Sequence, residues 1–272
     1  MTGKPPPERG MAFRALIPNA VTALALCFGL TGVRFAVSAA QGNDNHWELA
    51  LACVVGAGVL DGMDGRIARL LRAQSRFGAE LDSLSDVSAF GVAPALIMFL
   101  WSLHAAPQFG WIASLALAVC CALRLARFNS RMDADDQPHK SAGYLTGVPA
   151  PAGAGLAFVP VYLWLVTGHN EIFRAWYVVM PWVIFIALLL ISSVATFSWS
   201  SLRIRRGSRL FVIAGIGLLG AALITQPWIT LLAISLVYIA MVPFSIASYA
   251  RVRRRRAAGA AHAAAVVSGN AG

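Results

Sequence analysis

Five of the twelve acidic residues in this chain of 272 fall between positions 61 and 86: Asp61, Asp64, Glu80, Asp82 and Asp86. The first two aspartates are three residues apart and the last two are four apart, so within helices each pair shares one face. A carboxylate in apolar surroundings costs at least a few kcal/mol unless it is paired, hydrated or bound to metal. Salt bridges to nearby arginines would explain one such aspartate, but four in helical register favour a functional site.

The chemistry open to this cluster follows from its donor atoms. Four carboxylates without histidine or cysteine suit Mg²⁺ or Mn²⁺ rather than zinc. Two divalent ions would balance four negative charges and form the paired clamp used in phosphoryl chemistry. The pattern therefore predicts a two-metal site built from Asp61, Asp64, Asp82 and Asp86.

Small and basic residues flank the aspartates. Gly65 follows Asp64, and Gly78 precedes Asp82 by four positions, so both glycines lie on or beside a carboxylate face where a ligand can approach. Arg69, one turn beyond Gly65, is placed to hold a phosphate. The structural alternatives are tight helix packing for the glycines and snorkelling to the membrane interface for the arginine.

The elements that must position these residues are membrane helices. Hydrophobic residues make up 58% of the chain, charged residues 12%, and the mean hydropathy is +0.68, which nearly excludes a soluble globule. Windows of about 20 apolar residues, the length that crosses the hydrocarbon core, predict an all-α fold with about eight transmembrane helices. The predicted spans are 15–38, 47–70, 82–104, 110–129, 148–168, 175–196, 209–226 and 228–250.

The net charge of +10 marks topology rather than nucleic-acid binding. With both termini cytoplasmic, all 22 lysines and arginines except Arg34 and Arg174 fall in cytoplasmic segments, as the positive-inside rule requires. The predicted organisation is a cytoplasmic segment over 1–14, a transmembrane domain over 15–250, and a basic, low-complexity cytoplasmic tail over 251–272.

The segment DGMDGRIARLLRAQSRFGAELDSLSD has the form D-x2-D-G-x2-A-R-x8-G-x3-D-x3-D. It resembles the signature of the CDP-alcohol phosphotransferase family at every fixed position, and the predicted spans agree with that family along most of the chain. The resemblance implies a divalent-metal-dependent transfer of a phosphatidyl or similar group from a CDP-linked donor to an alcohol, with release of CMP. It also implies a homodimer among membrane lipids.

The same resemblance implies roles for individual residues. Three positions match the family's metal ligands: Asp61, Asp64 and Asp82. Asp86 matches the general base, which also touches the second metal. Five positions match residues that contact the CDP part of the donor, the first two of them in the stretch IPNAVT: Asn19, Thr22, Gly65, Arg69 and Ser75.

Two downstream stretches, LRLARFNSRMD (123–133) and YLTGVPAPAGAG (144–155), resemble the phosphatidylserine synthase branch, although GVPAP replaces the commoner G-L-P-S-P. This implies CDP-diacylglycerol as donor and L-serine as acceptor. Serine carries a carboxylate and an ammonium group, so its site needs a cation and an acceptor, and the candidates are Arg124, Arg127 and Asn129. The two arginines could equally bind the donor's diphosphate or serve only as positive-inside anchors.

Two other functions compete with this interpretation. A sibling enzyme would use glycerol 3-phosphate or inositol as the acceptor. Activity measured with a panel of acceptor alcohols distinguishes it from an enzyme that uses serine. An ion-coupled transporter would also need carboxylates in the membrane, but these acids gather near one face, and the two halves show no inverted repeat. We therefore expect a multi-pass membrane enzyme with its active site at the cytoplasmic face, in the inner membrane if the source is bacterial.

Overall fold

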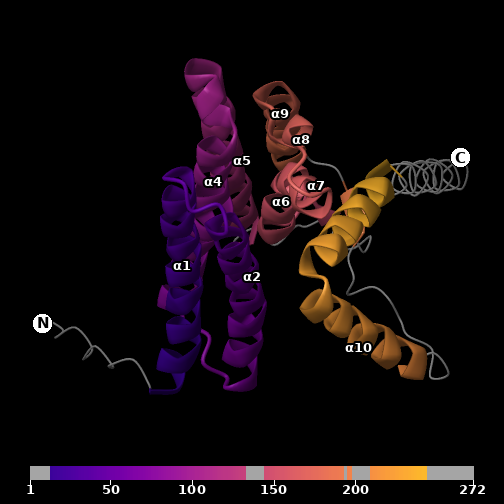
Figure 1. Cartoon of the computed structure of the whole chain (residues 1–272). Coiled ribbons are helices and arrows are strands. Elements are labelled where there is room, and N and C mark those ends of the chain that lie inside the picture. The colour runs from indigo at the N-terminus through magenta and orange to yellow at the C-terminus, as the bar shows by residue number, and fades with distance from the viewer. Residues whose placement is uncertain (1–12, 133–143, 193–194, 198–208, 244–272) are drawn as a thin grey trace, which may run out of the picture.

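The computed structural model describes residues 13–132, 144–192, 195–197 and 209–243. Within these ranges the chain is almost entirely helical (Figure 1), and one short antiparallel pairing joins β1 (Tyr144–Thr146) to β2 (Ala195–Phe197). The all-α prediction is thus confirmed for the described part of the chain. The tail over 251–272 and almost all of the predicted segment over 1–14 lie outside it.

The first half of the chain is built around a long hairpin of α1 (Phe13–Ala40) and α2 (His46–Leu70). These helices approach closely at Gly32, which has no side chain. A Cβ at this position would lie only 2.9 Å from the Ala50 carbonyl oxygen. The next elements are α3 (Arg76–Asp86), a π-helical turn η1 (Val87–Val92), α4 (Ala93–Trp101), a short 3₁₀ turn η2 (Leu103–Ala105) and α5 (Pro107–Met132).

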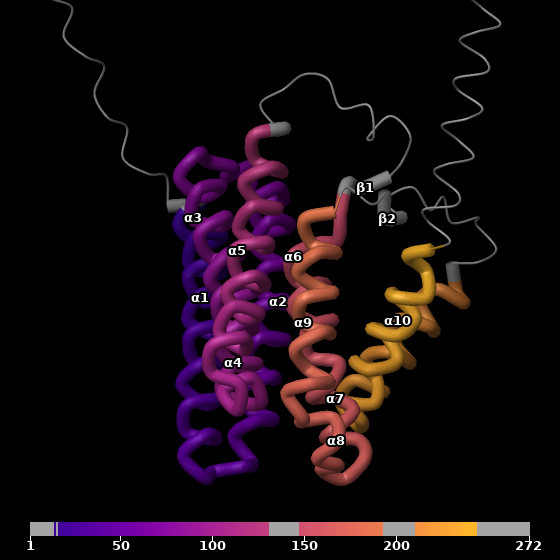
Figure 2. Tube along the Cα trace, turned by 90° about the horizontal axis from the view of Figure 1, so that it is seen from above, coloured from indigo at the N-terminus to yellow at the C-terminus, as the bar shows by residue number. Residues whose placement is uncertain are grey.

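The second half packs on the first through α9, which lies against α5. Figures 1 and 2 show α10 and the helix that follows it on the far side of α9 from α1. The elements in chain order are α6 (Ala150–Ala157), α7 (Val159–Val166), α8 (Glu171–Arg174), α9 (Trp176–Ile191), α10 (Arg209–Thr225) and a helix over Pro227–Pro243.

Helices occur in all eight windows predicted as spans, as far as the structure describes them. Among the residues that the structure describes, three helical stretches are long and apolar enough to cross a membrane: Leu16–Ala40, Arg76–Trp101 and Pro107–Ser130. The fifth window is divided into α6 and α7, because Pro160 in the first turn of α7 has no backbone N–H to continue the preceding helix. The number of crossings therefore stays a prediction.

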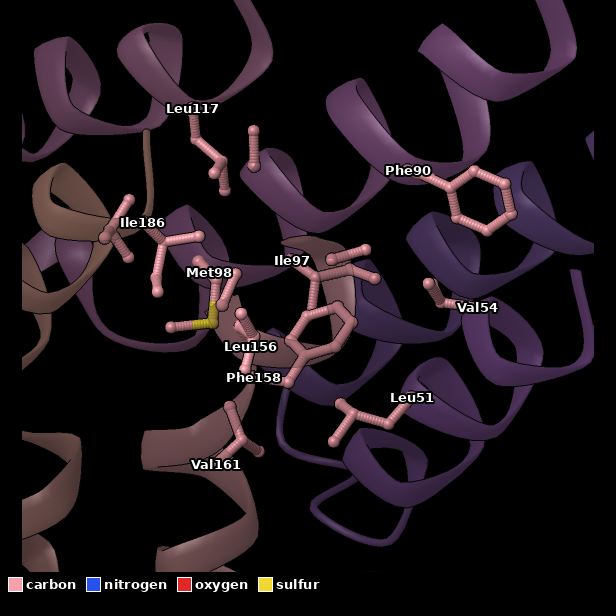
Figure 3. Packing of buried hydrophobic residues seen from close by; sticks show 14 of the residues in the cluster. Leu51, Val54, Phe90, Ile97, Met98, Leu117, Leu156, Phe158, Val161 and Ile186 are labelled. Atoms are coloured by element: carbon pink, nitrogen blue, oxygen red, sulfur yellow. The ribbon is translucent and has the colours of Figure 1, made fainter. Parts of the chain in front are cut away.

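An apolar core lies where α4, α5, α6 and α9 meet (Figure 3). Ile97 and Met98 of α4 gather there with Leu117, Leu156 and Ile186, and each of these side chains is at most 2% exposed. Because lipid tails are as apolar as these side chains, close packing between the helices, rather than removal from water, holds this core together in a membrane. This core holds α4 in place. Because α4 ends the helical stretch Arg76–Trp101, which begins with α3, the core also fixes the position of that stretch.

Arg174, one of the two basic residues predicted outside the cytoplasmic segments, lies among aromatic rings. Its guanidinium carbon is 5.9 Å from the ring centre of Trp47 and 5.7 Å from that of Trp164, and its Nε donates to the Trp101 carbonyl oxygen at 3.0 Å. Cation–π contacts of this kind strengthen when the groups are desolvated. Because Trp47 lies in the first turn of α2 and Asp61 and Asp64 lie in its second half, this cluster and those aspartates lie toward opposite ends of that helix.

Candidate active site

Three of the four predicted metal-ligating aspartates meet between α2 and α3. One carboxylate oxygen from each of Asp61, Asp64 and Asp82 lies within 4.8 Å of the other two. Asp64 is only 5% exposed. Asp86 lies one helical turn beyond Asp82, with its carboxyl against that of Asp61. The convergence predicted from the spacing of the aspartates is therefore present in the structure.

The helical stretch that carries Asp82 and Asp86 packs against both helices of the first hairpin. Its later part, η1 and α4, contacts α2, whereas α3 packs mainly against α1. The reason lies in the side chains of α3 that face α1, since Gly78 lies beside Asn19 and Ser85 bonds to Thr22. The carboxylates consequently project into the space between α2 and α3, with α1 as the third wall.

A hydroxyl group of α1 orients the most buried of these carboxylates. Thr22 Oγ1 donates to Asp64 Oδ2 at 2.6 Å, and it also lies 3.1 Å from the Pro18 carbonyl oxygen. Ser85 Oγ of α3 in turn donates to the Thr22 carbonyl oxygen at 3.2 Å. Thr22 and Ser85 are both buried, so these bonds tie α1, α2 and α3 together at the carboxylates.

A cavity of about 270 Å³ opens beside this junction, and we call it the α1–α3 cavity. Four of the five residues predicted to bind the donor line it, namely Asn19, Thr22, Gly65 and Ser75. Arg69 is exposed and is not among the lining residues, and its Nε donates to the Gly65 carbonyl oxygen at 3.1 Å. The other lining residues are Pro18, Asp64, Ala68, Ala73, Gln74, Gly78, Ala79 and Asp82.

The start of α3 is shaped for close approach to α1. Ser75 is the N-cap residue, and its Oγ accepts a hydrogen bond from the Gly78 N–H at 3.0 Å, the usual way of satisfying a free donor at a helix start. A Cβ on Gly78 would lie 2.8 Å from Asn19 Oδ1 and 3.1 Å from Ser75 Oγ. Glycine at position 78 thus keeps both polar side chains at the edge of the cavity.

A second, larger cavity of about 670 Å³ lies on the other side of α3, and we call it the α3–α5 cavity. Asp82 lines both cavities, whereas Asp86 lines only this one. Its remaining walls come from α3, α5 and the start of α6: Arg76, Ala79, Glu80, Ser83, Arg124, Leu125, Phe128, Asn129, Pro149, Ala150 and Pro151.

The three predicted acceptor contacts separate in the structure. Arg124 and Asn129 line the α3–α5 cavity, and Asn129 Nδ2 donates to Ser83 Oγ at 2.8 Å. Arg127 is not among the lining residues, because its Nη1 donates to the Ile191 carbonyl oxygen at 2.9 Å. Arg127 therefore joins α5 to the end of α9.

Two opposite charges in this cavity have buried atoms with no hydrogen-bond partner among the described residues: Asp86 Oδ1 and Arg124 Nε. Buried polar atoms are nearly always paired in proteins, so exceptions require a reason. Both residues line the cavity, and a polar ligand there would satisfy them. The arrangement fits a small molecule that has both a group able to donate to a carboxylate and an anionic group.

Two serines that support the site were not predicted from the sequence. Ser83 and Ser85 lie in the segment DSLSD, between Asp82 and Asp86. Two small hydroxyl residues among the acids of an otherwise apolar helix were a usable signal, since hydroxyls commonly hold carboxylates and amides in place by hydrogen bonding.

The three converging aspartates fit a divalent cation. Two ligand oxygens on opposite sides of an ion are about 4–5 Å apart, given metal–oxygen distances of about 2.0–2.6 Å, and the oxygens here lie within 4.8 Å of one another. All three donors are carboxylates, which suit Mg²⁺ or Mn²⁺. The cluster can thus hold a metal ion beside both cavities.

Comparison with known proteins gives two family matches. The model of the CDP-alcohol phosphatidyltransferase family matches residues 15–192, and that of CDP-alcohol phosphatidyltransferase 2 matches residues 208–243. The first match covers every helix that contributes to the two cavities.

Curated relatives are similar over most of the chain. The CDP-diacylglycerol–serine O-phosphatidyltransferase of Mycobacterium tuberculosis H37Rv is 35% identical over 248 residues, which are 91% of this chain and 84% of the relative. The protein of that name from Mycobacterium leprae is 35% identical over 246 residues, 90% of this chain and 79% of the relative. The one from Helicobacter pylori 26695 is 38% identical over 150 residues, 54% of this chain and 58% of the relative.

Proposed function

Because the chain belongs to the CDP-alcohol phosphatidyltransferase family, we propose that it transfers the phosphatidyl group of CDP-diacylglycerol to the hydroxyl of L-serine. The products would be phosphatidylserine and CMP. The names of the mycobacterial relatives support serine as the acceptor. One arrangement supports the proposal above all others: Asp82 separates a cavity lined by the expected donor residues from a second cavity that holds Asp86 and Arg124.

The α1–α3 cavity would receive the CDP part of the donor. Asn19, Thr22 and Ser75 offer polar atoms there, and Gly65 adds no side chain. Arg69 would reach the donor's phosphates from the rim, after release of its Nε from the Gly65 carbonyl oxygen. Guanidinium groups bind phosphates through charge-assisted hydrogen bonds.

Asp61, Asp64 and Asp82 would hold Mg²⁺ or Mn²⁺, and Asp86 would face a second ion. When bound, the ions offset negative charge on the diphosphate and on the departing CMP. Thr22 keeps the Asp64 carboxylate in place for this role through its 2.6 Å hydrogen bond. Groups that orient metal ligands in this way strengthen metal binding.

The α3–α5 cavity would receive serine. Arg124 would bind the serine carboxylate, and Asp86 would take the proton of the hydroxyl group as general base. The serine oxygen then bonds to the phosphorus that carries diacylglycerol, and the bond from that phosphorus to the CMP oxygen breaks. Most of the rate enhancement would come from holding these groups in position.

The location of the reaction follows from the substrates. The acyl chains of the donor stay in lipid while its cytidine group and serine come from water, so the site must lie at a membrane surface. The distribution of basic residues supports the cytoplasmic surface. A multi-pass topology with both termini cytoplasmic and a homodimeric assembly are part of this proposal.

An acceptor panel on the purified protein tests the function. In detergent with Mn²⁺ or Mg²⁺ and CDP-diacylglycerol, we expect CMP release only with L-serine, and mass spectrometry should detect phosphatidylserine. Glycerol 3-phosphate and inositol are the competing acceptors. Activity with either of these and none with serine would assign the chain to a sibling enzyme, and no CMP release with any alcohol would overturn the enzymatic proposal.

A further inference from the structure

The helix that carries Asp82 and Asp86 does not continue into α4 as a regular α-helix. Residues Val87–Val92 form the π-helical turn η1, at whose end the Ala93 N–H bonds to the Ser88 carbonyl oxygen five residues earlier. Asp86 is the residue immediately before this turn. Single π-helical turns are rare in proteins and are frequent at functional sites.

The π-helical turn changes the direction in which Asp86 points. Each residue of an α-helix advances about 100° around the axis, so positions 86 and 97 of an uninterrupted α-helix would face almost the same way. Ile97 is fully buried in the core. The extra residue of a π-helical turn rotates the preceding helix by about 100° relative to the following one. Asp86 can therefore line the α3–α5 cavity while Ile97 stays in the core.

Two neighbouring helices pack directly on this turn at glycines. From α1, a Cβ on Gly29 would lie 2.8 Å from Ala89 Cα and 2.9 Å from Ala89 Cβ. Toward α5, a Cβ on Gly91 would lie 3.2 Å from Cys121 Cβ and 3.3 Å from its Sγ. A methyl group at Gly29 would have to displace the backbone of the turn, and one at Gly91 would require Cys121 or the turn to move by a few tenths of an ångström.

We infer that η1, packed between α1 and α5 at Gly29 and Gly91, fixes the rotation of α3 that directs Asp82 and Asp86 toward the metal site and away from the core. Gly29 and Gly91 are then positioning residues for the proposed reaction, on which this inference rests. Protein interiors are close-packed and transmit small displacements. Asp86 is adjacent to the turn, so a shift there moves its carboxylate directly.

The test enlarges the contact at Gly91 and then restores the space. We expect Gly91→Ala to lower kcat by about tenfold or more, because a rotation of α3 moves the carboxylates of Asp82 and Asp86. Mn²⁺ affinity, measured by electron paramagnetic resonance of the free ion, should fall by about threefold or more. Adding Cys121→Gly, which removes both close atoms, should return kcat to within about threefold of Cys121→Gly alone.

Gly58→Ala is the matched control, since its Cβ would face the same turn from α2 at an ordinary 3.7 Å from Phe90 Cε1. Its kcat and Mn²⁺ affinity should stay within about twofold of the wild type. If Gly91→Ala does not fold, Cys121→Val enlarges the same contact from α5 and should lower kcat and Mn²⁺ affinity in the same way.

The outcomes separate this inference from the proposed function. If the wild-type protein shows no serine-dependent CMP release, the proposed function is contradicted. The Mn²⁺ affinities of the wild type and the variants still test the inference. If the wild-type protein is active but Gly91→Ala has the same kcat and Mn²⁺ affinity as Gly58→Ala, the inference is contradicted and the proposed function is not. The same holds for a folded double variant that remains as slow as Gly91→Ala.

Discussion

Thr22 and Asp64 are joined by a hydrogen bond of 2.6 Å although they lie 42 positions apart. Through this bond α1, which has no acidic residue of its own, becomes part of the carboxylate cluster. The same helix lines the α1–α3 cavity with Asn19 and packs on η1 at Gly29. The first helix thus contributes to the carboxylate cluster, to the α1–α3 cavity and to the packing around η1.

Replacing Thr22 by valine should weaken metal binding without changing the shape of the site. The substitution keeps the branched side chain but removes the donor to Asp64, and loss of such an orienting bond typically costs about 10–100-fold in metal affinity. Titration with Mn²⁺ measures the effect. Thr31→Val is the matched control, because the Thr31 hydroxyl donates only to the Cys27 carbonyl oxygen within α1. Equal Mn²⁺ affinities of the two variants would show that Thr22 does not support the site.

Asp86→Asn should abolish proton removal while leaving the donor cavity intact. We expect kcat to fall by about a thousandfold, within the range for loss of a general base, and CDP-diacylglycerol binding to change by less than about threefold. Single-turnover CMP release and equilibrium binding of the donor measure these two quantities. Asp44→Asn, in the exposed turn between α1 and α2, is the control. A variant that keeps more than about a tenth of wild-type turnover would remove Asp86 from the base role.

Arg124 and Arg127 should differ sharply in their effect on serine. Arg124 lines the α3–α5 cavity, so Arg124→Gln should raise the KM for L-serine by about tenfold or more through loss of a charged hydrogen bond. Arg127 instead donates to the Ile191 carbonyl oxygen, and Arg127→Gln should leave that KM within about threefold. Steady-state CMP release at varied serine concentration compares the two. A larger KM increase for Arg127→Gln would reverse the assignment.

Gly78→Ala should affect the donor selectively. The added methyl group would displace Asn19 Oδ1 and Ser75 Oγ, which lie within 3.1 Å of its position, so we expect the KM for CDP-diacylglycerol to rise by about fivefold. The KM for serine should change much less. Gly155→Ala in α6 is the control, since a Cβ there meets nothing within 4 Å and the residue lines neither cavity. An unchanged donor KM would mean that the Asn19 edge of the cavity does not contact the donor.

The aspartate cluster could be predicted from the sequence because helical spacing determines a shared face whatever the tertiary packing. Asp61 with Asp64, and Asp82 with Asp86, needed only the assumption that each pair lies in one helix. The packing partner of α3 could not be predicted in this way, because it depends on how Gly78 and Ser85 fit against α1. The short link between α2 and α3 favours α2 as a neighbour, which η1 and α4 contact, but it does not predict that α3 packs on α1.

The other differences also depend on distant packing. The segment VSAFGV has no residue pattern that distinguishes a π-helical turn from an α-helix, and the turn packs against Gly29 and Cys121, which are distant in the sequence. Arg124 and Arg127 look equivalent in sequence, since both are basic residues near the end of one helix. They differ because the bonding partner of Arg127 comes from α9, 64 positions away.

Asp82 and Ala79 line both cavities, so molecules bound on the two sides would share the carboxylate of Asp82. Charge brought near this group from the donor side alters the electrostatic energy of a molecule on the serine side. Such coupling is reciprocal: if bound donor changes the affinity for serine by some factor, bound serine changes the affinity for the donor by the same factor. Under the proposed function, the carboxylate of Asp82 would therefore couple the binding of two chemically unrelated substrates.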